Sequence, residues 1–422
     1  QGKFAEGTIC YTGDVSDTTR EKYTLKYYVD MAKELQKRGC HAIAIKDMAG
    51  LLKPYAAREL VKALKDALDI PIQLHTHDTS GNQVAAVLMA AEEGVDIVDL
   101  AISSMSSLTS QPSLNAVVAA LEGQPRDTGI DLMQLQKLSN YWEDVRERYA
   151  EFESDLKTPF TEIYRYEIPG GQYSNLKPQV ESLGLGDRFE EVKEMYKKVN
   201  DMLGDLVKVT PSSKMVGDMA IFMVQHDLTP ENILEKGADL SYPDSVVSYF
   251  KGMMGQPAWG FPEELQKIVL KGEKPITCRP GELLPPADFD SARAHLKKMM
   301  GDMIKISRKD AEKLREALET KSNGDPTDRA VISWCLYPKV YEEFIQKRRE
   351  YGYISRLGSH IFFHGMAPGE ISQVEIEDGK TLAIKYVGLG ELNDEGERAV
   401  LFEPNGLRRE VSVVDQSAAD QV

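Results

Sequence analysis

The stretch HAIAIKDMAGLLKPYAARELVKALKDALDIPIQLHTH, residues 41–77, carries the main fold signal of this chain. Its two ends, 41–47 and 70–77, are short and almost continuously apolar, which is typical of strands buried on both faces. Between them, residues 54–68 repeat apolar side chains with helical spacing. A strand, a helix and a second strand in this order predict a parallel βαβ unit.

The same unit recurs on both sides of this stretch. GTICYTG (7–13) and VDIVDLAIS (95–103) are further apolar strands, and YTLKYYVDMAKELQKRG (23–39) has helical periodicity. These units fill residues 1–122, about half of the ~250 residues of an eight-fold β/α barrel. The pattern alone therefore predicts either half of such a barrel or an open α/β sheet.

After residue 125 the pattern becomes mainly helical and stays so up to residue 285. The clearest helical segments are 131–149, 187–203, 213–228 and 244–254. We therefore expect 126–285 to be a helical extension of the first 125 residues, with its charged helix faces in solvent.

A third part follows the proline-rich stretch PITCRPGELLPPADF (275–289), which we interpret as a linker. Two helical segments come first, SARAHLKKMMGDM (291–303) and DAEKLREALE (310–319). Alternating strands follow, and DG at 378–379 and NG at 405–406 predict hairpin turns between them. We expect a separate, small α+β domain over 286–422.

Composition and charge narrow the function classes. The chain of 422 residues is 42% hydrophobic and 28% charged, with a net charge of −16. Without a basic stripe, nucleic acid and anionic membranes are poor partners, and no apolar run approaches the roughly 20 residues that span a bilayer. The chain opens QGKFAEG, without an initiator methionine or a signal-peptide pattern, so we expect a piece of a longer protein.

Cysteine usage bears on the compartment. The four cysteines are scattered without a CxxC pair, at Cys10, Cys40, Cys278 and Cys335. This distribution favours a reducing compartment. We therefore expect the cytoplasm, or the mitochondrial matrix if the source is eukaryotic.

Three of the expected strands end in chemically capable side chains. Lys46 and Asp47 end one strand, His75 and His77 end the next, and the polar run 103–109 follows the fourth. Alternate strand residues share a face, so the two imidazoles lie side by side. This arrangement at a strand end favours a divalent metal site. The alternative is one hydrogen-bonded core histidine and one solvated histidine.

Four motifs in a fixed order carry a resemblance to a known family. They are IKDMAGLLKP (45–54), HTHDTSG (75–81), PGGQYSNL (169–176) and TPSSKMVGDMA (210–220). Together with MGQPAWGFP and FFHGMAPGE, the set resembles the carboxyltransferase domain of the biotin-dependent pyruvate carboxylases over essentially the whole chain. The resemblance implies a (β/α)8 TIM barrel of which only the second half is present, a helical extension, and an allosteric or tetramerisation domain.

The resemblance also implies a metal site. It makes His75 and His77 ligands and makes Lys46 a ligand as its carbamate, because a free lysine is an ammonium that repels a dication. A further aspartate ligand and the pyruvate-binding arginines and glutamine belong to the barrel half that this sequence lacks. The mixed ligand set does not select between manganese, zinc and cobalt. From the residues alone, Lys46 could equally be the salt-bridge partner of Asp47.

Thr210 matches the catalytic threonine of the family. The implied reaction moves a carboxyl group from carboxybiotin to pyruvate through a metal-stabilised enolate and yields oxaloacetate. A hydroxyl both donates and accepts, so Thr210 can relay a proton from pyruvate to biotin. Ser213 and Lys214 match positions around the biotin pocket. The residues alone also allow Ser212 or Ser213 to cap a helix that begins near Lys214.

Other polar residues in the motifs have simpler interpretations. We expect Gln172 and Asn175 to be structural loop residues, and His360 and His364 to serve packing or an interface. VGLGEL at 387–392 lacks the strand-then-helix context of a dinucleotide-binding loop.

The resemblance implies partners outside this chain. The carrier signature, a lysine between two methionines, is missing, so we expect the biotin carrier domain after residue 422 or on another chain, and the ATP-using biotin carboxylase domain before residue 1. A homotetramer is implied as well.

Three rival interpretations remain. The α subunit of oxaloacetate decarboxylase and a transcarboxylase subunit share the IKDMAG and HxHDTxG motifs but not the C-terminal tail. Metal-dependent aldol or Claisen lyases of the same superfamily lack the lysine ligand. A non-catalytic oligomerisation fragment would leave the metal and threonine motifs without a purpose.

Overall fold

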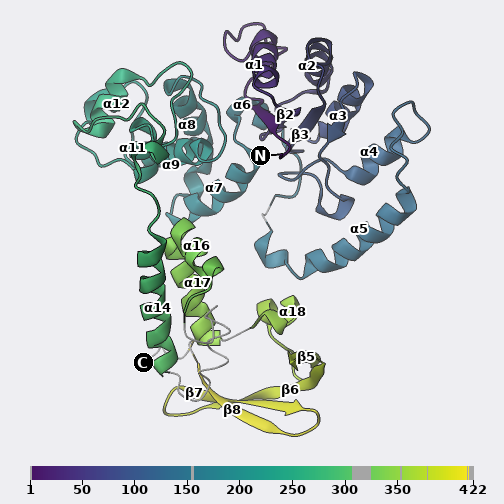
Figure 1. Cartoon of the computed structure of the whole chain (residues 1–422), viewed down its shortest axis with the longest axis vertical. Helices are drawn as coiled ribbons and strands as arrows, with labels where there is room; N and C mark the ends of the chain where they lie inside the picture. Colours follow the sequence, from purple (N-terminus) through teal and green to yellow (C-terminus); the bar gives the residue numbers. More distant parts are fainter. Residues whose placement is uncertain are drawn as a thin grey trace. The chain divides into compact units, whose positions relative to one another are not determined.

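The computed structural model of the chain describes residues 2–153, 156–306, 325–351, 354–377, 379–415 and 417. The chain separates into two compact units, Gln1–Leu284 and Pro285–Val422 (Figure 1). The predicted helix 310–319 and Asp378 of the DG turn lie outside the described residues.

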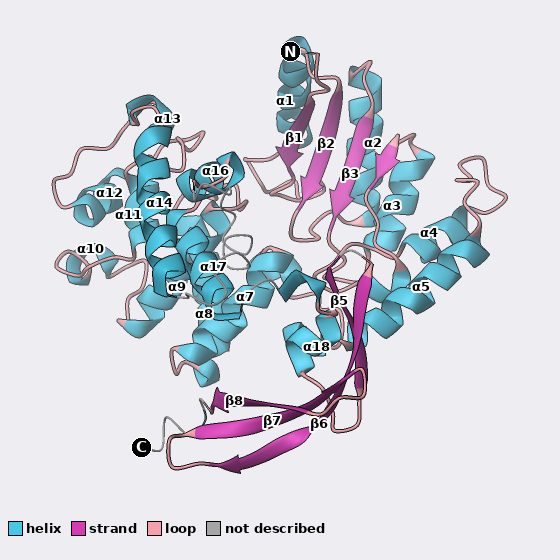
Figure 2. Cartoon of the chain, turned by 60° about the horizontal axis from the view of Figure 1, so that its bottom comes forward, coloured by secondary structure: helices cyan, strands magenta, loops and turns pink. Residues whose placement is uncertain are grey.

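The first unit begins with a parallel sheet in the order β1-β2-β3-β4, as the repeated strand–helix pattern predicts. Helices α1, α2 and α3 connect these strands and lie along one face of the sheet (Figure 2). The bounds are β1 Glu6–Cys10, α1 Leu25–Lys37, β2 Ala42–Asp47, α2 Pro54–Ala67, β3 Ile72–Thr76, α3 Gln83–Glu92 and β4 Ile97–Val98. The prediction of an α/β fold is confirmed.

Local chemistry sets the ends of these elements. The Thr24 side chain accepts a hydrogen bond from the Tyr27 N–H and so caps α1. Pro54 occupies the first turn of α2, where its missing N–H costs no helical hydrogen bond. The fourth strand is shorter than the predicted 95–103, because its pairing with β3 ends at Val98. Beyond it, Ala101 forms an isolated bridge with Ser113, and a 3₁₀ turn begins at Ser103.

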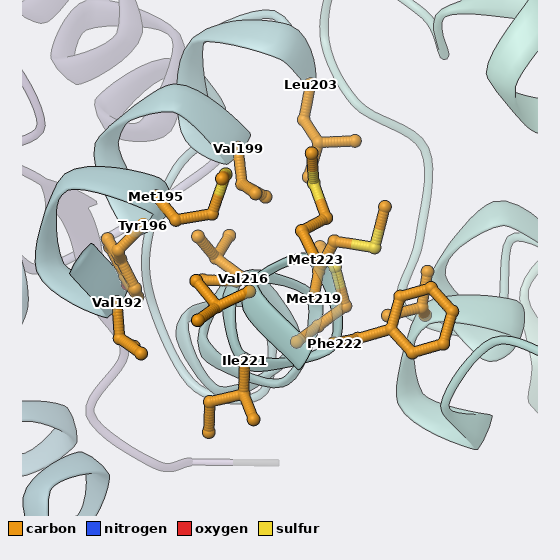
Figure 3. Packing of buried hydrophobic residues seen from close by; sticks show 14 of the residues in the cluster. Val192, Met195, Tyr196, Val199, Leu203, Val216, Met219, Ile221, Phe222 and Met223 are labelled. Carbon is orange, nitrogen blue, oxygen red and sulfur yellow. The ribbon is translucent and has the colours of Figure 1, made fainter. Parts of the chain in front are cut away.

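The rest of the first unit is helical, which confirms the predicted change of pattern. Its helices are α4 Leu114–Leu121, α5 Leu132–Glu147, α6 Ile163–Tyr166, α7 Gly170–Ser182, α8 Phe189–Met202, α9 Ser212–Gln225, α10 Ile233–Lys236, α11 Asp244–Phe250, α12 Glu263–Leu270 and α13 Pro280–Leu283, with 3₁₀ turns at Ser103–Met105, Ala150–Phe152 and Gly186–Arg188. Helices α8 and α9 form the centre of this region. Their apolar side chains, including Tyr196, Val199, Val216 and Met219, meet in one buried core (Figure 3).

The second unit pairs a small helical core with an antiparallel sheet in the order β5-β6-β7-β8. Its elements are α14 Phe289–Ile306, α16 Asp328–Leu336, α17 Pro338–Tyr351, a 3₁₀ turn at Ile354–Arg356, α18 Ser359–His364, β5 Ile371–Glu377, β6 Lys380–Leu392, β7 Glu397–Pro404 and β8 Arg409–Val414. Asn405 and Gly406 both have positive φ angles, 49° and 80°. These φ signs are those of a type I′ turn, across which the Leu407 N–H donates to the Pro404 carbonyl at 3.1 Å. The turn lies in the connection between the antiparallel strands β7 and β8, so the predicted hairpin turn at NG is confirmed.

Within the described residues, no helix is long and apolar enough to cross a bilayer. All four cysteines are free.

Candidate active site

One face of the parallel sheet brings the predicted metal ligands together. Lys46 of β2 lies opposite His75 of β3, and Cys10 of β1 lies opposite Lys46. Paired residues of neighbouring strands point to the same face, and His77 returns to that face two residues after His75. Burial raises the pKa of the Cys10 thiol, and the neighbouring Lys46 ammonium opposes that rise. The strand register therefore places Lys46, His75 and His77 side by side.

The ring of His75 is held by a carboxylate. Its Nδ1 atom lies 2.9 Å from Asp99 Oδ2. Asp99 in turn accepts hydrogen bonds from Gln73 Nε2 at 3.0 Å on each of its two oxygens. An ionised carboxylate only accepts, so Nδ1 carries the proton and the Nε2 lone pair is free to bind a metal.

The ring of His77 is held by a backbone carbonyl. Its Nδ1 atom lies 2.6 Å from the Thr109 carbonyl oxygen, which also only accepts. The centroids of the two imidazole rings are 5.2 Å apart. Burial lowers the pKa of His77, the Thr109 carbonyl opposes this, and His75 and Lys46 lower it further. The neutral form, which is the form that binds metal, is therefore favoured.

The start of α7 closes the site around His77. Gly170 donates its N–H to the Met48 carbonyl at 3.0 Å. A β-carbon at position 170 would lie 3.4 Å from His77 Nδ1 and 3.3 Å from the Thr109 oxygen, so a side chain there would crowd the ring. The Ser174 hydroxyl donates a hydrogen bond to Thr109 Oγ1 at 3.1 Å and so holds the Thr109 side chain in place.

Gln172 and Asn175, which we expected in a loop, instead belong to α7. The expectation failed because the PGG opening suggested a turn, whereas Pro169 precedes the helix and Gly170 is its first residue. Asn175 is exposed and donates to the Gly171 carbonyl, and Gln172 packs closely against Gly217 of α9.

Asp47 has a structural role that excludes pairing with Lys46. Its carboxylate is buried and accepts hydrogen bonds from the N–H groups of Leu51 and Leu52, both at 2.9 Å, and from the Thr76 hydroxyl at 2.8 Å. Neighbouring strand residues point to opposite faces, so Lys46 points away from these groups. The salt-bridge alternative is wrong.

The donor chemistry of this face fits part of a metal site. Two free Nε2 atoms and one lysine converge, but the described residues include no group of three or more histidine, cysteine, aspartate or glutamate side chains that could hold a metal ion. Lys46 adds to the two imidazoles only if it supplies an anionic oxygen, as a carbamate does.

Thr210 lies in a separate cleft. It is exposed, and among the described residues its hydroxyl has no hydrogen-bond partner. The cleft has a volume of about 370 Å³ and includes Tyr23, Tyr249, Gln256 and Trp259 in its lining, but not Lys46, His75 or His77. The described residues therefore do not bring Thr210 into contact with the histidine pair.

Ser213 and Lys214 do not line this cleft. Helix α9 begins at Ser212, two residues before the predicted start, and Pro211 at its N-cap makes no side-chain cap bond. The Ser212 hydroxyl contacts the Val209 N–H and the carbonyls of Val207 and Val209 instead. Ser213 is buried, and Lys214 Nζ pairs with Asp218 at 2.7 Å.

His360 and His364 lie on α18 of the second unit. Their ring centroids are 5.5 Å apart, and His360 Nε2 lies 3.6 Å from Glu370. His364 also lines an apolar cavity of about 740 Å³ together with side chains from the β5–β8 sheet.

Sequence reasoning did not single out Asp99 or assign a role to Thr109. An acid directly after an apolar strand is the only signal for Asp99, and it becomes meaningful once β4 lies beside β3. No local signal assigns a role to the Thr109 carbonyl, because every residue has a backbone carbonyl and the residue type does not show which one binds a histidine.

Two known protein families match this chain. The family described as "Conserved carboxylase domain" matches residues 163–311 and 301–385, and the family described as "HMGL-like" matches residues 12–141.

Individual relatives match over the whole chain. The pyruvate carboxylase of Bacillus subtilis is 52% identical over 421 residues, covering 100% of this chain and 35% of the relative. That of Staphylococcus aureus is 51% identical over 417 residues, covering 99% of this chain and 34% of the relative. The chain thus spans about a third of the length of these curated relatives.

Solved structures of pyruvate carboxylase are similar to this chain over nearly its whole length. The carboxyl transferase domain of Rhizobium etli pyruvate carboxylase superposes with a TM-score of 0.88 at 47% identity, covering 98% of this chain and 66% of that one. The same domain with pyruvate and biocytin also gives 0.88, at 48% identity, covering 98% of this chain and 66% of that one.

The parallel α/β sheet with paired histidines at its carboxyl edge lies in the HMGL-like match, and the chain belongs to the conserved carboxylase domain family, whose model matches more than half of it. Within that family it corresponds to the carboxyltransferase region of pyruvate carboxylase.

Proposed function

We propose that this chain forms part of the site that transfers a carboxyl group from carboxybiotin to pyruvate, giving oxaloacetate. The observation that carries this proposal is the convergence of Lys46, His75 and His77 on one sheet face. The Rhizobium etli domain, 48% identical, has a structure with pyruvate and biocytin, which supports the same substrate class here.

We infer that the β1–β4 sheet is the second half of a (β/α)8 barrel. Within the described residues, β1 pairs only with β2 and β4 only with β3, so both edges are open to further parallel strands. The missing half would supply the aspartate ligand and the pyruvate-binding side chains. Residues 1–125, 126–285 and 286–422 would then be the half barrel, the helical extension, and the allosteric or tetramerisation domain.

The proposed metal ligands are His75 and His77 through Nε2 and Lys46 as its carbamate. Manganese, zinc or cobalt would supply Lewis-acid polarisation of the pyruvate oxygens when bound. The protein's own contribution is to present two neutral imidazoles in fixed orientations, with Asp99 and the Thr109 carbonyl holding the opposite ring nitrogens.

Thr210 is the proposed proton carrier between pyruvate and biotin. Its exposed hydroxyl has no partner among the described residues, so it is available both to donate and to accept. Ser213 and Lys214 would act at the biotin pocket, for which Lys214 must leave its ion pair with Asp218 and the buried Ser213 must become accessible.

Further domains complete the enzyme in this proposal. The relatives are about three times longer than this chain, which leaves room for a biotin carrier domain and an ATP-using biotin carboxylase domain in a homotetramer. The compartment would be the cytoplasm, or the mitochondrial matrix in a eukaryote; the relatives from Rattus norvegicus and Homo sapiens are named mitochondrial.

A His75→Ala variant of the full-length enzyme tests the function. We expect loss of most bound metal, measured by elemental analysis, and loss of pyruvate-dependent carboxyl transfer, with ATP-dependent biotin carboxylation unchanged. His226→Ala, at the exposed C-cap of α9, is the control. Full metal occupancy in the His75→Ala enzyme would refute the assignment.

A further inference from the structure

Four charged side chains from separate segments of the first unit meet beneath the Thr210 loop. Arg20 Nη1 lies 2.9 Å from Glu167 Oε1, and Arg20 Nη2 lies 3.0 Å from Asp205 Oδ2. Lys208 Nζ lies 3.1 Å from Glu167 Oε2 and 3.8 Å from Asp205 Oδ1. Two cations and two carboxylates thus alternate around one closed network.

This network is buried. The side chains of Lys208 and Glu167 are only 2% and 8% exposed. Two such groups are expensive to remove from water, and removal of one partner leaves the other as an uncompensated buried charge. The network therefore restrains the two backbone segments that carry Lys208 and Glu167.

The backbone on one side is the loop that presents Thr210. Lys208 lies two residues before Thr210 in the chain. The Tyr23 hydroxyl donates to the Asp205 carbonyl at 2.5 Å, and the Ser212 hydroxyl donates to the Val207 carbonyl at 2.6 Å. The loop is held at both ends, and the buried Lys208 side chain is its anchor to the α6–α7 segment.

The backbone on the other side leads to the histidine pair. Glu167 lies three residues before Gly170, where an added β-carbon would lie 3.3 Å from Thr109 Cβ and 3.4 Å from His77 Nδ1. One oxygen of Glu167 binds Arg20 and the other binds Lys208. Glu167 therefore connects the loop that carries Thr210, through its bond to Lys208, with the chain segment that leads to Gly170 beside His77.

We propose that the Lys208–Glu167 pair is a positioning device that fixes the Thr210 hydroxyl relative to the histidine face. Neither residue would touch a reacting atom; both act through the placement of Thr210. The inference rests on the proposed role of Thr210 in proton transfer.

The chain offers a matched control for simple loss of a buried charge. Lys193 of α8 is 3% exposed, and its Nζ pairs with Glu162 at 2.7 Å and Glu190 at 2.8 Å. It thus resembles Lys208 in burial and in the number of its partners, but it lies on a helix outside the loop that carries Thr210. The Lys193 partners are more exposed than Glu167, at 52% and 73%, so its replacement should cost less stability. A purely structural role of Lys208 predicts a loss of stability with an unchanged kcat of the folded enzyme.

The experiment uses the full-length enzyme with the Lys208→Met, Lys193→Met and Lys208→Arg substitutions. We expect both methionine variants to lose thermal stability. Only Lys208→Met should lose kcat for pyruvate carboxylation, by about 100-fold, which is typical of a displacement near 1 Å. Its KM for pyruvate should stay near the wild-type value, and Lys208→Arg should recover part of the kcat.

A double variant decides whether the effect passes through Thr210. If it does, adding Lys208→Met to a Thr210→Ala enzyme should cost no further kcat, because the group that is positioned is already absent. Full additivity of the two losses would overturn the inference. If Lys208→Met fails to fold, Glu167→Gln, which keeps the side-chain shape, replaces it in the same comparison.

The remaining outcomes separate this inference from the proposed function. An inactive Thr210→Ala enzyme beside a Lys208→Met enzyme of normal kcat would overturn the positioning role alone. A Thr210→Ala enzyme of normal kcat would overturn the proton-transfer role of Thr210, and the positioning role with it. Equal kcat losses in Lys208→Met and Lys193→Met would reduce the network to a stabilising element.

Discussion

His75 and Asp99 form a directed pair: the imidazole donates through Nδ1 to a carboxylate oxygen 2.9 Å away, and Gln73 holds that carboxylate through both of its oxygens. The carboxylate fixes the tautomer and the direction of the Nε2 lone pair. Because the ring is already oriented, metal binding costs little further rotational entropy of the His75 side chain. The pair therefore contributes to metal affinity although Asp99 would not touch the metal.

The Asp99→Asn substitution should weaken metal binding in the full-length enzyme. Loss of a group that orients a metal-binding histidine typically costs about 10- to 100-fold in affinity. Competition with a chelator, followed by metal analysis, measures the change. Asp96→Asn is the control, because Asp96 pairs with Lys65 and the Ile72 N–H and not with a histidine. Equal metal affinity in the two variants would rule out the orienting role of Asp99.

Gly50→Ala should destabilise the protein and disturb His77. Gly50 has φ +74°, and a β-carbon there would lie 2.3 Å from the His77 carbonyl oxygen. Backbone strain of this kind costs about 1–3 kcal/mol, and relief of the clash must move the strand end that carries His77. Gly39→Ala is the matched control, with φ +93° and no atom within 4 Å of the added carbon. Thermal melts that show the same loss for both variants would contradict the prediction.

Thr210→Ala should abolish carboxyl transfer and leave stability nearly unchanged. The hydroxyl is exposed and, within the described residues, binds no protein group, so its removal breaks no bond of the fold. Proton-transfer groups typically supply about 10²–10⁴ in rate. Thr210→Ser keeps the hydroxyl and should keep measurable activity. Turnover with pyruvate, measured beside thermal stability, tests this; an active alanine variant would end the catalytic assignment.

Acid should destabilise the first unit through Glu167. Burial raises the pKa of Glu167, but Lys208 and Arg20 outweigh burial, so the pKa lies below its usual value of 4.5 in the folded protein. As pH falls, the unfolded chain binds this proton first. The stabilising contribution is therefore complete above the unfolded pKa and is lost as pH falls through the lower folded value.

Urea unfolding between about pH 6 and about pH 3 should show this loss as a falling free energy of unfolding. Glu167→Gln should have a shallower slope over the same range, because it has no proton to bind. Glu147→Gln, on an exposed position of α5, should keep the wild-type slope. Parallel curves for the wild type and Glu167→Gln would contradict the prediction.

The local part of the architecture could be predicted from sequence. Continuous apolar strands around a helix predicted the parallel sheet, and the two-residue period placed His75 and His77 on one face. The fourth strand was overestimated, because its apolar run continues where the tertiary structure turns the chain at Ser103. Gln172 and Asn175 were predicted in a loop, because the sequence PGG is typical of a turn, although here it begins a helix.

The supporting contacts of the site could not be predicted in the same way. The Thr109 carbonyl and the Asp99 carboxylate reach the histidines from positions 32 and 24 residues away, across neighbouring segments. The four-residue network that includes Lys208 joins segments whose proximity follows only from the folded core. Such contacts depend on packing between layers, which no local pattern encodes.

The ion pairs of Arg20 have a consequence for the order in which the chain acquires structure. Its partners Glu167 and Asp205 lie 147 and 185 residues further along the sequence. During synthesis, which proceeds from the N-terminus, the β1–β4 strands and their helices emerge well before these partners exist. Closing so long a loop carries a large entropic cost, so the network forms late. A nascent chain thus passes through a stage with a folded β1–β4 sheet and an unpaired arginine, and Thr210 reaches its place only as the later helices pack.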